Sequence, residues 1–230
     1  MFAHPDDESF GPAGTIAKYA ASGHKIILLT FTRGEAGSLG VSKALGREQL
    51  AQRRSKELKC AAAVLGIQDV RILRFPDKAL NTVPDEKTIP LIIDTIHEIK
   101  PEVVITFHPN GISGHADHKQ LTHWATRAIS QIRPSPRLMV YGLISSQTDA
   151  VLQRRLIPIP EEEITHKIDI LPFLEKKIKA IQCHVTQAEL WKQLQLMGIP
   201  YDEFARWEHF SQVFPPVKKN RIAHDLFEEN

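Results

Sequence analysis

The sequence opens with MFAHPDDESFG (residues 1–11), in which a short apolar lead runs into one histidine and three carboxylates. These polar residues are His4, Asp6, Asp7 and Glu8. A histidine and an aspartate three residues apart on a turn can both point at one metal ion, and the adjacent carboxylate can then act on an activated water. The alternative is a cluster of negative charge at the start of a helix, which the helix dipole favours. The segment alone leaves both interpretations open.

A second cluster, HADH (residues 115–118), favours the metal. His115 and His118 are three residues apart, so they share one face on the first turn of a helix. With His4 and Asp7, a histidine of this cluster makes a set of three protein ligands with one position open. That arrangement is typical of catalytic zinc rather than of a closed structural site. Zinc held there would lower the pKa of its water to about 7.

The other polar residues of the two clusters suit hydrolysis. A general base typically adds about 10² to 10⁴ in rate, and Asp6, next to Asp7, is the candidate. If His118 is the metal ligand, His115 is available to stabilise an oxyanion or to protonate a leaving amine. Asp117 could orient or charge a neighbouring imidazole. Together these residues predict metal-assisted hydrolysis by an activated water.

Apolar runs alternate with helical patterns along the rest of the chain. Strands are expected at 25–32, 70–73, 103–107 and 138–143, and helices at 11–22, 48–65, 85–100 and 118–132. This alternation predicts an α/β fold, with a Rossmann-like, mostly parallel sheet flanked by helices. Ligands of such sheets bind beyond the carboxyl ends of the strands. Polar clusters follow the expected strands at 4–8, 33–37, 77 and 108–118, so one active site is expected at that edge.

The ends of the chain are less regular. One domain is expected over residues 1–230, since this length suits a single large core. Only three residues precede His4, so either the first strand is very short or the natural chain begins earlier. An edge strand is expected at 165–170, helices at 172–183 and 188–197, and a polar tail at 218–230.

Composition excludes several classes of function. The formal net charge is +2 and the basic residues are spread along the chain, so nucleic-acid binding has little electrostatic support. No apolar run approaches the roughly 20 residues of a membrane span, and no basic-then-apolar leader precedes the first motif. Cys60 and Cys183 predict no disulfide framework. A soluble, reducing, cytoplasmic setting is therefore expected, and a homo-oligomer stays open. The loop at 33–40, which follows the strand expected at 25–32, lacks a G-x-G-x-x-G, and this argues against a nucleotide-dependent oxidoreductase.

The two clusters together closely resemble a known family. His4-Pro5-Asp6-Asp7-Glu8 with His115-x-Asp117-His118 is similar to the PIG-L/LmbE-like family of zinc-dependent N-deacetylases. That family includes enzymes that deacetylate N-acetylglucosaminyl inositol or malate conjugates. The likeness extends over most of the chain, through Thr32-x-Gly34-Glu35, Arg54-x-x-Glu57, Phe75-Pro76-Asp77 and His184-x-Thr186-Gln187.

The resemblance implies a role for each matching residue. The zinc ligands would be His4, Asp7 and His118, with one Zn²⁺ per chain or another divalent metal in its place. Asp6 would be the general base, His115 would stabilise the tetrahedral intermediate, and Asp117 would assist His115. Sugar hydroxyls would be held by Glu35, Arg54 and Asp77.

The implied reaction is hydrolysis of an acetamide on a small-molecule N-acetylated sugar conjugate. Zinc and His115 would polarise the carbonyl, and Asp6 would deprotonate the water. Two alternatives remain: a zinc amidase acting on a non-sugar substrate, and a zinc- or sugar-binding protein without turnover. The presence of both Asp6 and His115 speaks against a pure binder, because binding requires neither of them.

Overall fold

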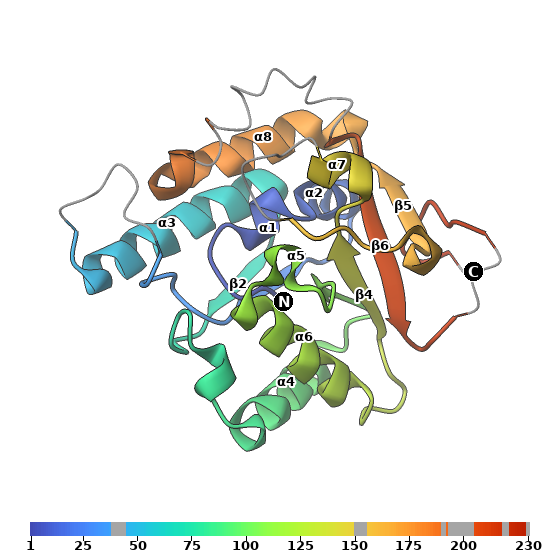
Figure 1. The fold of residues 1–230 in the computed structure, drawn as a ribbon, viewed down its shortest axis with the longest axis horizontal. Helices are drawn as coiled ribbons and strands as arrows, with labels where there is room; N and C mark the ends of the chain where they lie inside the picture. The colour runs from blue at the N-terminus through green and yellow to red at the C-terminus, as the bar shows by residue number, and fades with distance from the viewer. Residues whose placement is uncertain (38–44, 150–155, 190–191, 193–204, 218–220, 229–230) are drawn as a thin grey trace. The chain divides into compact units, whose positions relative to one another are not determined.

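The computed structural model describes residues 1–37, 45–149, 156–189, 192, 205–217 and 221–228 (Figure 1). The chain divides into two compact units, one of Met1–Lys78 with Asp169–Glu208 and one of Ala79–Ile168 with His209–Asn230. The helix expected at 188–197 lies largely outside the described residues, as does part of the tail expected at 218–230. Within the described residues, no helix combines the length and apolar composition needed to cross a bilayer.

The first unit combines a short parallel sheet with several helices. Its elements are α1 (Asp7–Phe10), α2 (Ala13–Ala21), β1 (Ile27–Thr30), α3 (Arg47–Leu65), β2 (Asp69–Ile72), η3 (Leu171–Phe173), α8 (Leu174–Cys183) and η4 (Val185–Gln187). β1 and β2 pair in parallel. Phe2 adds a single parallel bridge to Thr30, so the segment before His4 contributes one bridge to this edge. From Phe2 the chain continues directly into the opening cluster, which begins at His4.

Helix α3 provides much of the packing of this unit. Leu50, Leu58 and Leu65 recur at intervals that place them on one face, and all three are fully buried. Burying a leucine side chain contributes about 1.5–3 kcal/mol. The helix ends at Gly66, whose φ of 81° is a left-handed conformation that costs glycine little. α8 packs along α3 (Figure 1), so residues far apart in the sequence become neighbours.

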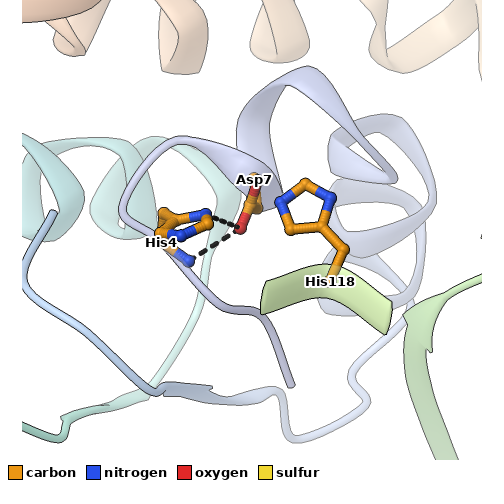
Figure 2. A group of neighbouring side chains, drawn as sticks. All are labelled: His4, Asp7 and His118. Atoms are coloured by element: carbon orange, nitrogen blue, oxygen red, sulfur yellow. Dashed lines mark hydrogen bonds and ion pairs between the residues drawn. The ribbon is translucent and has the colours of Figure 1, made fainter. Parts of the chain in front are cut away.

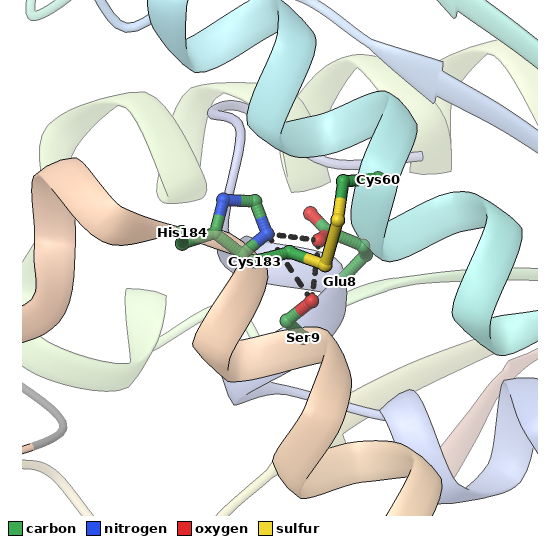
Figure 3. The surroundings of a disulfide bond; sticks show 5 residues. All are labelled: Glu8, Ser9, Cys60, Cys183 and His184. Carbon is green, nitrogen blue, oxygen red and sulfur yellow. Dashed lines mark hydrogen bonds and ion pairs between the residues drawn. A yellow bond between two sulfur atoms is a disulfide. The ribbon is translucent and has the colours of Figure 1, made fainter.

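This packing joins Cys60 of α3 to Cys183 at the end of α8 in a disulfide (Figure 3). Their Cα atoms are 5.8 Å apart. The two cysteines, from which no disulfide framework is expected, thus form one disulfide with each other. The two residues are 123 positions apart, and only the packing of the two helices brings them together.

The second unit is built on a four-stranded sheet with the order β3-β4-β6-β5. Its elements are η1 (Leu80–Thr82), α4 (Asp85–Ile99), β3 (Val103–Phe107), α5 (Gly111–Gly114), α6 (Ala116–Ile129), β4 (Arg137–Gly142), α7 (Ser145–Asp149), η2 (Glu161–Glu163), β5 (His166–Asp169) and β6 (Trp207–Phe214). β3 and β4 are parallel, as expected, but β6 runs antiparallel to β4. The α/β class is confirmed, whereas the prediction of a mostly parallel sheet is wrong at β6.

Strand β6 was not predicted, because buried polar side chains interrupt its apolar pattern. Glu208, His209 and Ser211 are all buried within it. A strand is recognised in a sequence by regular apolar spacing, and three buried polar residues in a row of eight obscure that signal. The expected edge strand at 165–170 is confirmed as β5, which ends the strand order.

Helix α6 carries the second polar cluster and is fixed by α4. The Asp85 carboxylate at the start of α4 accepts hydrogen bonds from Trp124 Nε1 at 2.8 Å and from Arg127 Nη1 at 2.8 Å. Trp124 is fully buried, as are Leu121 and Ile129 on the same helix. These contacts hold α6 in place, and its first turn bears His118.

Candidate active site

His4 lies between two carboxylates of the first unit. Its Nδ1 is 3.3 Å from Asp7 Oδ2, and its Nε2 is 3.2 Å from Asp77 Oδ1. The backbone N–H of His4 also donates to Asp7 Oδ2 at 2.7 Å. Figure 2 shows the imidazole beside the Asp7 carboxylate, with dashed lines for these contacts. His118, drawn in the same figure, comes from α6 of the second unit.

This arrangement calls for positive charge either on the His4 ring or next to it. If Nε2 donates to Asp77, a neutral ring presents a lone pair from Nδ1 toward Asp7 Oδ2, and two acceptors then face each other. The conflict is removed if the ring is an imidazolium, or if a cation takes both the nitrogen and the oxygen as ligands. A carboxylate behind a histidine is the usual support of a metal-ligating imidazole. His4 and Asp7 therefore provide a His/Asp pair that fits a divalent metal.

Asp77 is engaged by both of its oxygens. Oδ1 contacts His4, and Oδ2 accepts the backbone N–H of Ala36 at 2.7 Å. Burial alone would raise the pKa of Asp77, but the hydrogen bond and positive charge of His4 lower it below its usual value. The Asp77 N–H in turn donates to Glu35 Oε1 at 3.0 Å. The sugar-binding role expected for Asp77 stays a prediction, and the structure adds a contact that orients His4.

Asp6 adopts an unusual backbone conformation, with φ 118°. A non-glycine residue rarely occupies this region, and such residues concentrate at functional sites. Arg54 of α3 holds the segment, since its Nη2 donates to Asp6 Oδ2 at 3.0 Å and to the carbonyl oxygen of Pro5 at 2.5 Å. Burial raises the pKa of the Asp6 carboxyl to about 6, while the charge of Arg54 opposes the rise. A carboxyl tuned in this way suits a general base near neutral pH.

Glu35 and Arg54 each keep one buried polar atom without a hydrogen-bond partner among the described residues. These atoms are Glu35 Oε2 and Arg54 Nε. The Arg54 guanidinium also donates from Nη1 to the carbonyl oxygen of Gly34 at 3.0 Å, which fixes the start of the loop that carries Glu35. Unpartnered buried polar atoms are costly, and a ligand hydroxyl is one group that could satisfy them.

Glu8, the last carboxylate of the opening cluster, forms a third polar group with Ser9 and His184 (Figure 3). Glu8 Oε1 accepts hydrogen bonds from Ser9 Oγ at 2.6 Å and from His184 Nε2 at 2.7 Å. All three side chains are buried. Burial on its own would lower the pKa of His184, but the Glu8 carboxylate raises it above the usual histidine value. The hydrogen bond to Glu8 therefore favours the charged form of the His184 ring.

In the second unit, the HADH cluster is held mainly by its own neighbourhood. His115 is the N-cap of α6, and its Nδ1 accepts the Asp117 backbone N–H at 3.2 Å. Asp117 is fully buried and accepts the Leu80 N–H at 3.1 Å. The rings of His115 and His118 stack with centroids 4.7 Å apart. The two rings are neighbours, as expected, but His115 is the N-cap with an extended backbone and only His118 lies in the first helical turn.

The hydrogen bond of His118 determines which nitrogen can serve as a ligand. Its Nδ1 lies 3.1 Å from the carbonyl oxygen of Gly111, so this nitrogen must carry the proton. The lone pair is then on Nε2, as metal coordination requires. The ring also stacks on Phe107, with centroids 3.8 Å apart. Both contacts fix the orientation of the imidazole before any metal binds.

The structure thus brings together all the first-unit residues that the sequence singled out: His4, Asp6, Asp7, Glu35, Arg54 and Asp77. His115, Asp117 and His118 are neighbours within the second unit. That the two sets serve one metal stays a prediction. Sequence reasoning gave no role to Glu8 or His184, although both fall in quoted motifs, because nothing in their spacing indicates that they are partners.

Comparisons with known proteins bear on these residues. Residues 1–129 match the family described as PIG-L, GlcNAc-PI de-N-acetylase. A 1D-myo-inositol 2-acetamido-2-deoxy-α-D-glucopyranoside deacetylase from Acidothermus cellulolyticus is 32% identical, covering 81% of this chain and 78% of that protein. A Bacillus anthracis protein named "Probable N-acetyl-alpha-D-glucosaminyl L-malate deacetylase 2" is 31% identical, covering 81% of this chain and 79% of its own.

Solved structures share the fold. GalB, the 4-carboxy-2-hydroxymuconate hydratase from Pseudomonas putida KT2440, is similar with a TM-score of 0.72 over 96% of this chain and 97% of its own, at 23% identity. N,N'-diacetylchitobiose deacetylase from Pyrococcus horikoshii is similar with a TM-score of 0.69 over 91% of this chain and 80% of its own, at 20% identity. At these identities the likeness shows the fold alone.

Proposed function

The chain belongs to the GlcNAc-PI de-N-acetylase (PIG-L) family, and on that premise we propose that it is a metal-dependent N-deacetylase acting on an N-acetylglucosamine-type sugar conjugate. The observation that carries the proposal is the placement of His4 between Asp7 and Asp77. His4 Nδ1 and Asp7 Oδ2 offer a nitrogen and an oxygen ligand to one cation, and Asp6, next to Asp7 in the chain, has a raised pKa. A metal ligand pair next to a tuned base supports hydrolysis.

The proposed metal is Zn²⁺, one per chain, held by His4, Asp7 and His118. Nitrogen and carboxylate donors of this kind suit zinc, although other divalent metals accept them too. The proton on His118 Nδ1 supports this set, because it leaves Nε2 as the ligand atom. When bound, zinc supplies a Lewis acid for the acetamide carbonyl and a lower pKa for the attacking water.

The residues of the chain perform the proton transfers. Asp6 takes a proton from the water as its oxygen adds to the acetyl carbon. His115 stabilises the negative charge that develops on the carbonyl oxygen, with Asp117 as its support. The C–N bond then breaks, the proton held by Asp6 passes to the nitrogen, and acetate and a free amine leave. Losing one donor to such an oxyanion costs about 10² to 10³ in rate in other hydrolases.

The proposed substrate is a small-molecule N-acetylated sugar conjugate. The unpartnered Glu35 Oε2 and Arg54 Nε support this class, because sugar hydroxyls can both donate and accept. Both relatives named above carry a glucosaminide in their substrate names. The same match covers residues of both units, so we also propose that residues 1–230 act as one deacetylase domain.

Release of acetate tests the proposal. The purified chain is loaded with Zn²⁺ and given N-acetylglucosaminyl inositol, N-acetylglucosaminyl malate and a simple acetamide. We expect equal amounts of acetate and amine from a glucosaminide, loss of the reaction with a chelator, and recovery on adding zinc. Turnover of the simple acetamide at the same kcat/KM would favour a non-sugar amidase. Metal binding without turnover of any of the three substrates would favour a binding protein.

A cytoplasmic location completes the proposal. The Cys60–Cys183 disulfide argues in the other direction, because disulfides are rare in reducing compartments. Fractionation of the source cells, with thiol alkylation before lysis, tests the location of the protein and the oxidation state of its cysteines together. Reduced cysteines in the cytoplasmic fraction would support the location, and oxidised cysteines in another fraction would contradict it.

A further inference from the structure

The buried group of Glu8, Ser9 and His184 has a direct connection to Asp6. Glu8 Oε1 takes the hydrogen bonds of Ser9 and His184, while Glu8 Oε2 accepts the backbone N–H of Asp6 at 3.1 Å. One carboxylate therefore joins the imidazole to the residue with the unusual φ of 118°. No side chain of this group has a place in the reaction described above.

The backbone of Asp6 needs such a support. A non-glycine residue in this conformation costs of order 1–3 kcal/mol and persists only where its surroundings hold it. Arg54 holds the Asp6 carboxylate, and Glu8 holds the Asp6 N–H. The carbonyl oxygen of Asp6 accepts the N–H groups of Ser9 and Phe10, which are the first bonds of α1. Side chain and backbone of the proposed base are thus fixed independently.

Glu8 in turn depends on His184. A buried carboxylate without a cationic or donor partner is strongly disfavoured. His184 supplies that partner through Nε2, and its Nδ1 has no hydrogen-bond partner among the described residues. The single useful donor of the ring therefore faces Glu8, with Ser9 Oγ 3.2 Å away.

The position of His184 is fixed on both sides by α3. Cys183, directly before it, is bonded to Cys60 of α3. Thr186, two residues after it, donates from its N–H and its hydroxyl to the two carboxylate oxygens of Glu57 on α3, at 3.1 Å and 2.6 Å. The same helix carries Arg54. Arg54 thus comes from α3 itself, and His184 is anchored to the same helix through its neighbours Cys183 and Thr186, as precise placement of a reacting group requires.

From this geometry we infer that His184 is a positioning residue for catalysis, acting through Glu8 to hold the backbone of Asp6. The inference rests on the proposed function, because it takes Asp6 as the general base. His184 touches neither the substrate nor the metal in this scheme. Its loss should therefore lower kcat while leaving KM and metal content unchanged.

The same unit contains a buried ion pair that serves as a matched control. Lys177, also on α8, contacts Glu208 Oε1 at 2.7 Å and donates to the carbonyl oxygen of Gly11 at 2.6 Å. Glu208 accepts the N–H groups of Gly14 and Thr15 at the start of α2. This pair ties α8 to α2 in the way that His184 ties it to α1, but none of these contacts reaches Asp6.

Two substitutions of similar polarity separate positioning from packing. In His184→Gln the side-chain amide can reach the place of Nε2 and donate to Glu8, whereas in His184→Asn it stops at the place of Nδ1. We expect His184→Asn to lower kcat by about 10- to 100-fold, the usual cost of losing the partner behind a site residue. His184→Gln should recover most of that loss. KM and zinc per chain should match the wild type in both.

Lys177→Met completes the experiment. We expect it to lower the thermal midpoint at least as much as His184→Asn does, with kcat of the folded protein close to the wild-type value. Equal losses of kcat in His184→Asn and Lys177→Met would overturn the inference, as would a loss that His184→Gln does not recover. If the wild type releases no acetate, the proposed function fails instead, so the two failures are distinguishable.

Should His184→Asn not fold, Ser9→Ala replaces it. This variant removes one of the two donors to Glu8 Oε1 and leaves the imidazole in place. We expect a smaller loss of kcat in the same direction, again with unchanged KM and metal content. A wild-type kcat for Ser9→Ala would then overturn the inference.

Discussion

The two polar clusters are held in opposite ways. In the HADH cluster, His115 caps its own helix and His118 bonds to Gly111, seven residues before it. In the opening cluster, the supporting side chains come from far along the chain. Arg54 holds Asp6 from 48 residues away, and His184 holds Glu8 from 176 residues away.

The difference shows what each cluster requires of the fold. The cap at His115 and the hydrogen bond of His118 need only the local sequence, since each joins residues a few positions apart. A strained turn such as the one at Asp6 needs contacts from several elements to persist. The opening cluster should therefore be the more sensitive of the two to substitutions outside its own motif.

The largest expected effect is on the proposed base. Asp6→Asn should keep the metal and KM but lower kcat by about 10² to 10⁴, the usual contribution of a general base. The Asn side chain keeps an oxygen for Arg54, so the turn should remain folded. Metal analysis and steady-state kinetics on the same preparation measure both quantities. If Asp6→Asn loses its metal while Asp7→Asn keeps it, the two carboxylates have been assigned the wrong way round.

A smaller effect is expected on metal affinity when Asp77, which contacts His4 from outside the opening cluster, is substituted. Asp77→Asn should weaken metal affinity by about 10- to 100-fold, because the amide no longer fixes the imidazole as the carboxylate does. Competition with a coloured zinc chelator measures the affinity without an activity assay. Glu35→Gln is the matched control, since Glu35 belongs to the same network but bonds to Asp77 rather than to His4. Equal affinities in Asp77→Asn and the wild type would leave Asp77 with the sugar role alone.

The smallest expected effect is on how the free energy of unfolding depends on pH, through one buried histidine in each unit. His184 has a carboxylate partner, whereas the pKa of His209 on β6 is lowered to about 4 by burial and by the charge of Lys167. The unfolded chain takes up a proton at His209 near pH 6.5 and the folded chain only near 4, so stability is lost as pH falls between these values. The loss should be about 1 kcal/mol between pH 6 and 5.

Denaturant unfolding of wild type and His209→Gln measures this slope. The variant cannot titrate at this position, so the difference in unfolding free energy between the two proteins should change with pH in that window. The pH dependence of stability due to His184 has the opposite sign. Because the pKa of His184 is raised in the folded state, His184 stabilises the fold at low pH, and this contribution is lost as the pH rises through that pKa. A pH-independent difference between wild type and His209→Gln would contradict the assignment.

Much of the architecture was predictable from the sequence. The four strands expected between residues 25 and 143 correspond to β1 to β4, and the long helices to α3, α4 and α6. The family resemblance and the α/β class are confirmed. These features rest on local patterns, namely apolar periodicity and ligand-type residues at fixed spacing, which survive without knowledge of the packing.

The sequence by itself determined which residues belong to the two clusters, because a spacing of three residues places side chains together on any turn or helix. Only the tertiary structure decided that Asp77 stands behind His4, that Glu8 and His184 form a pair, that Cys60 bonds to Cys183, and that β6 joins the sheet. Each of these contacts joins segments that are far apart in the sequence. Their meeting depends on how helices and strands pack, and spacing along a sequence carries no information on that.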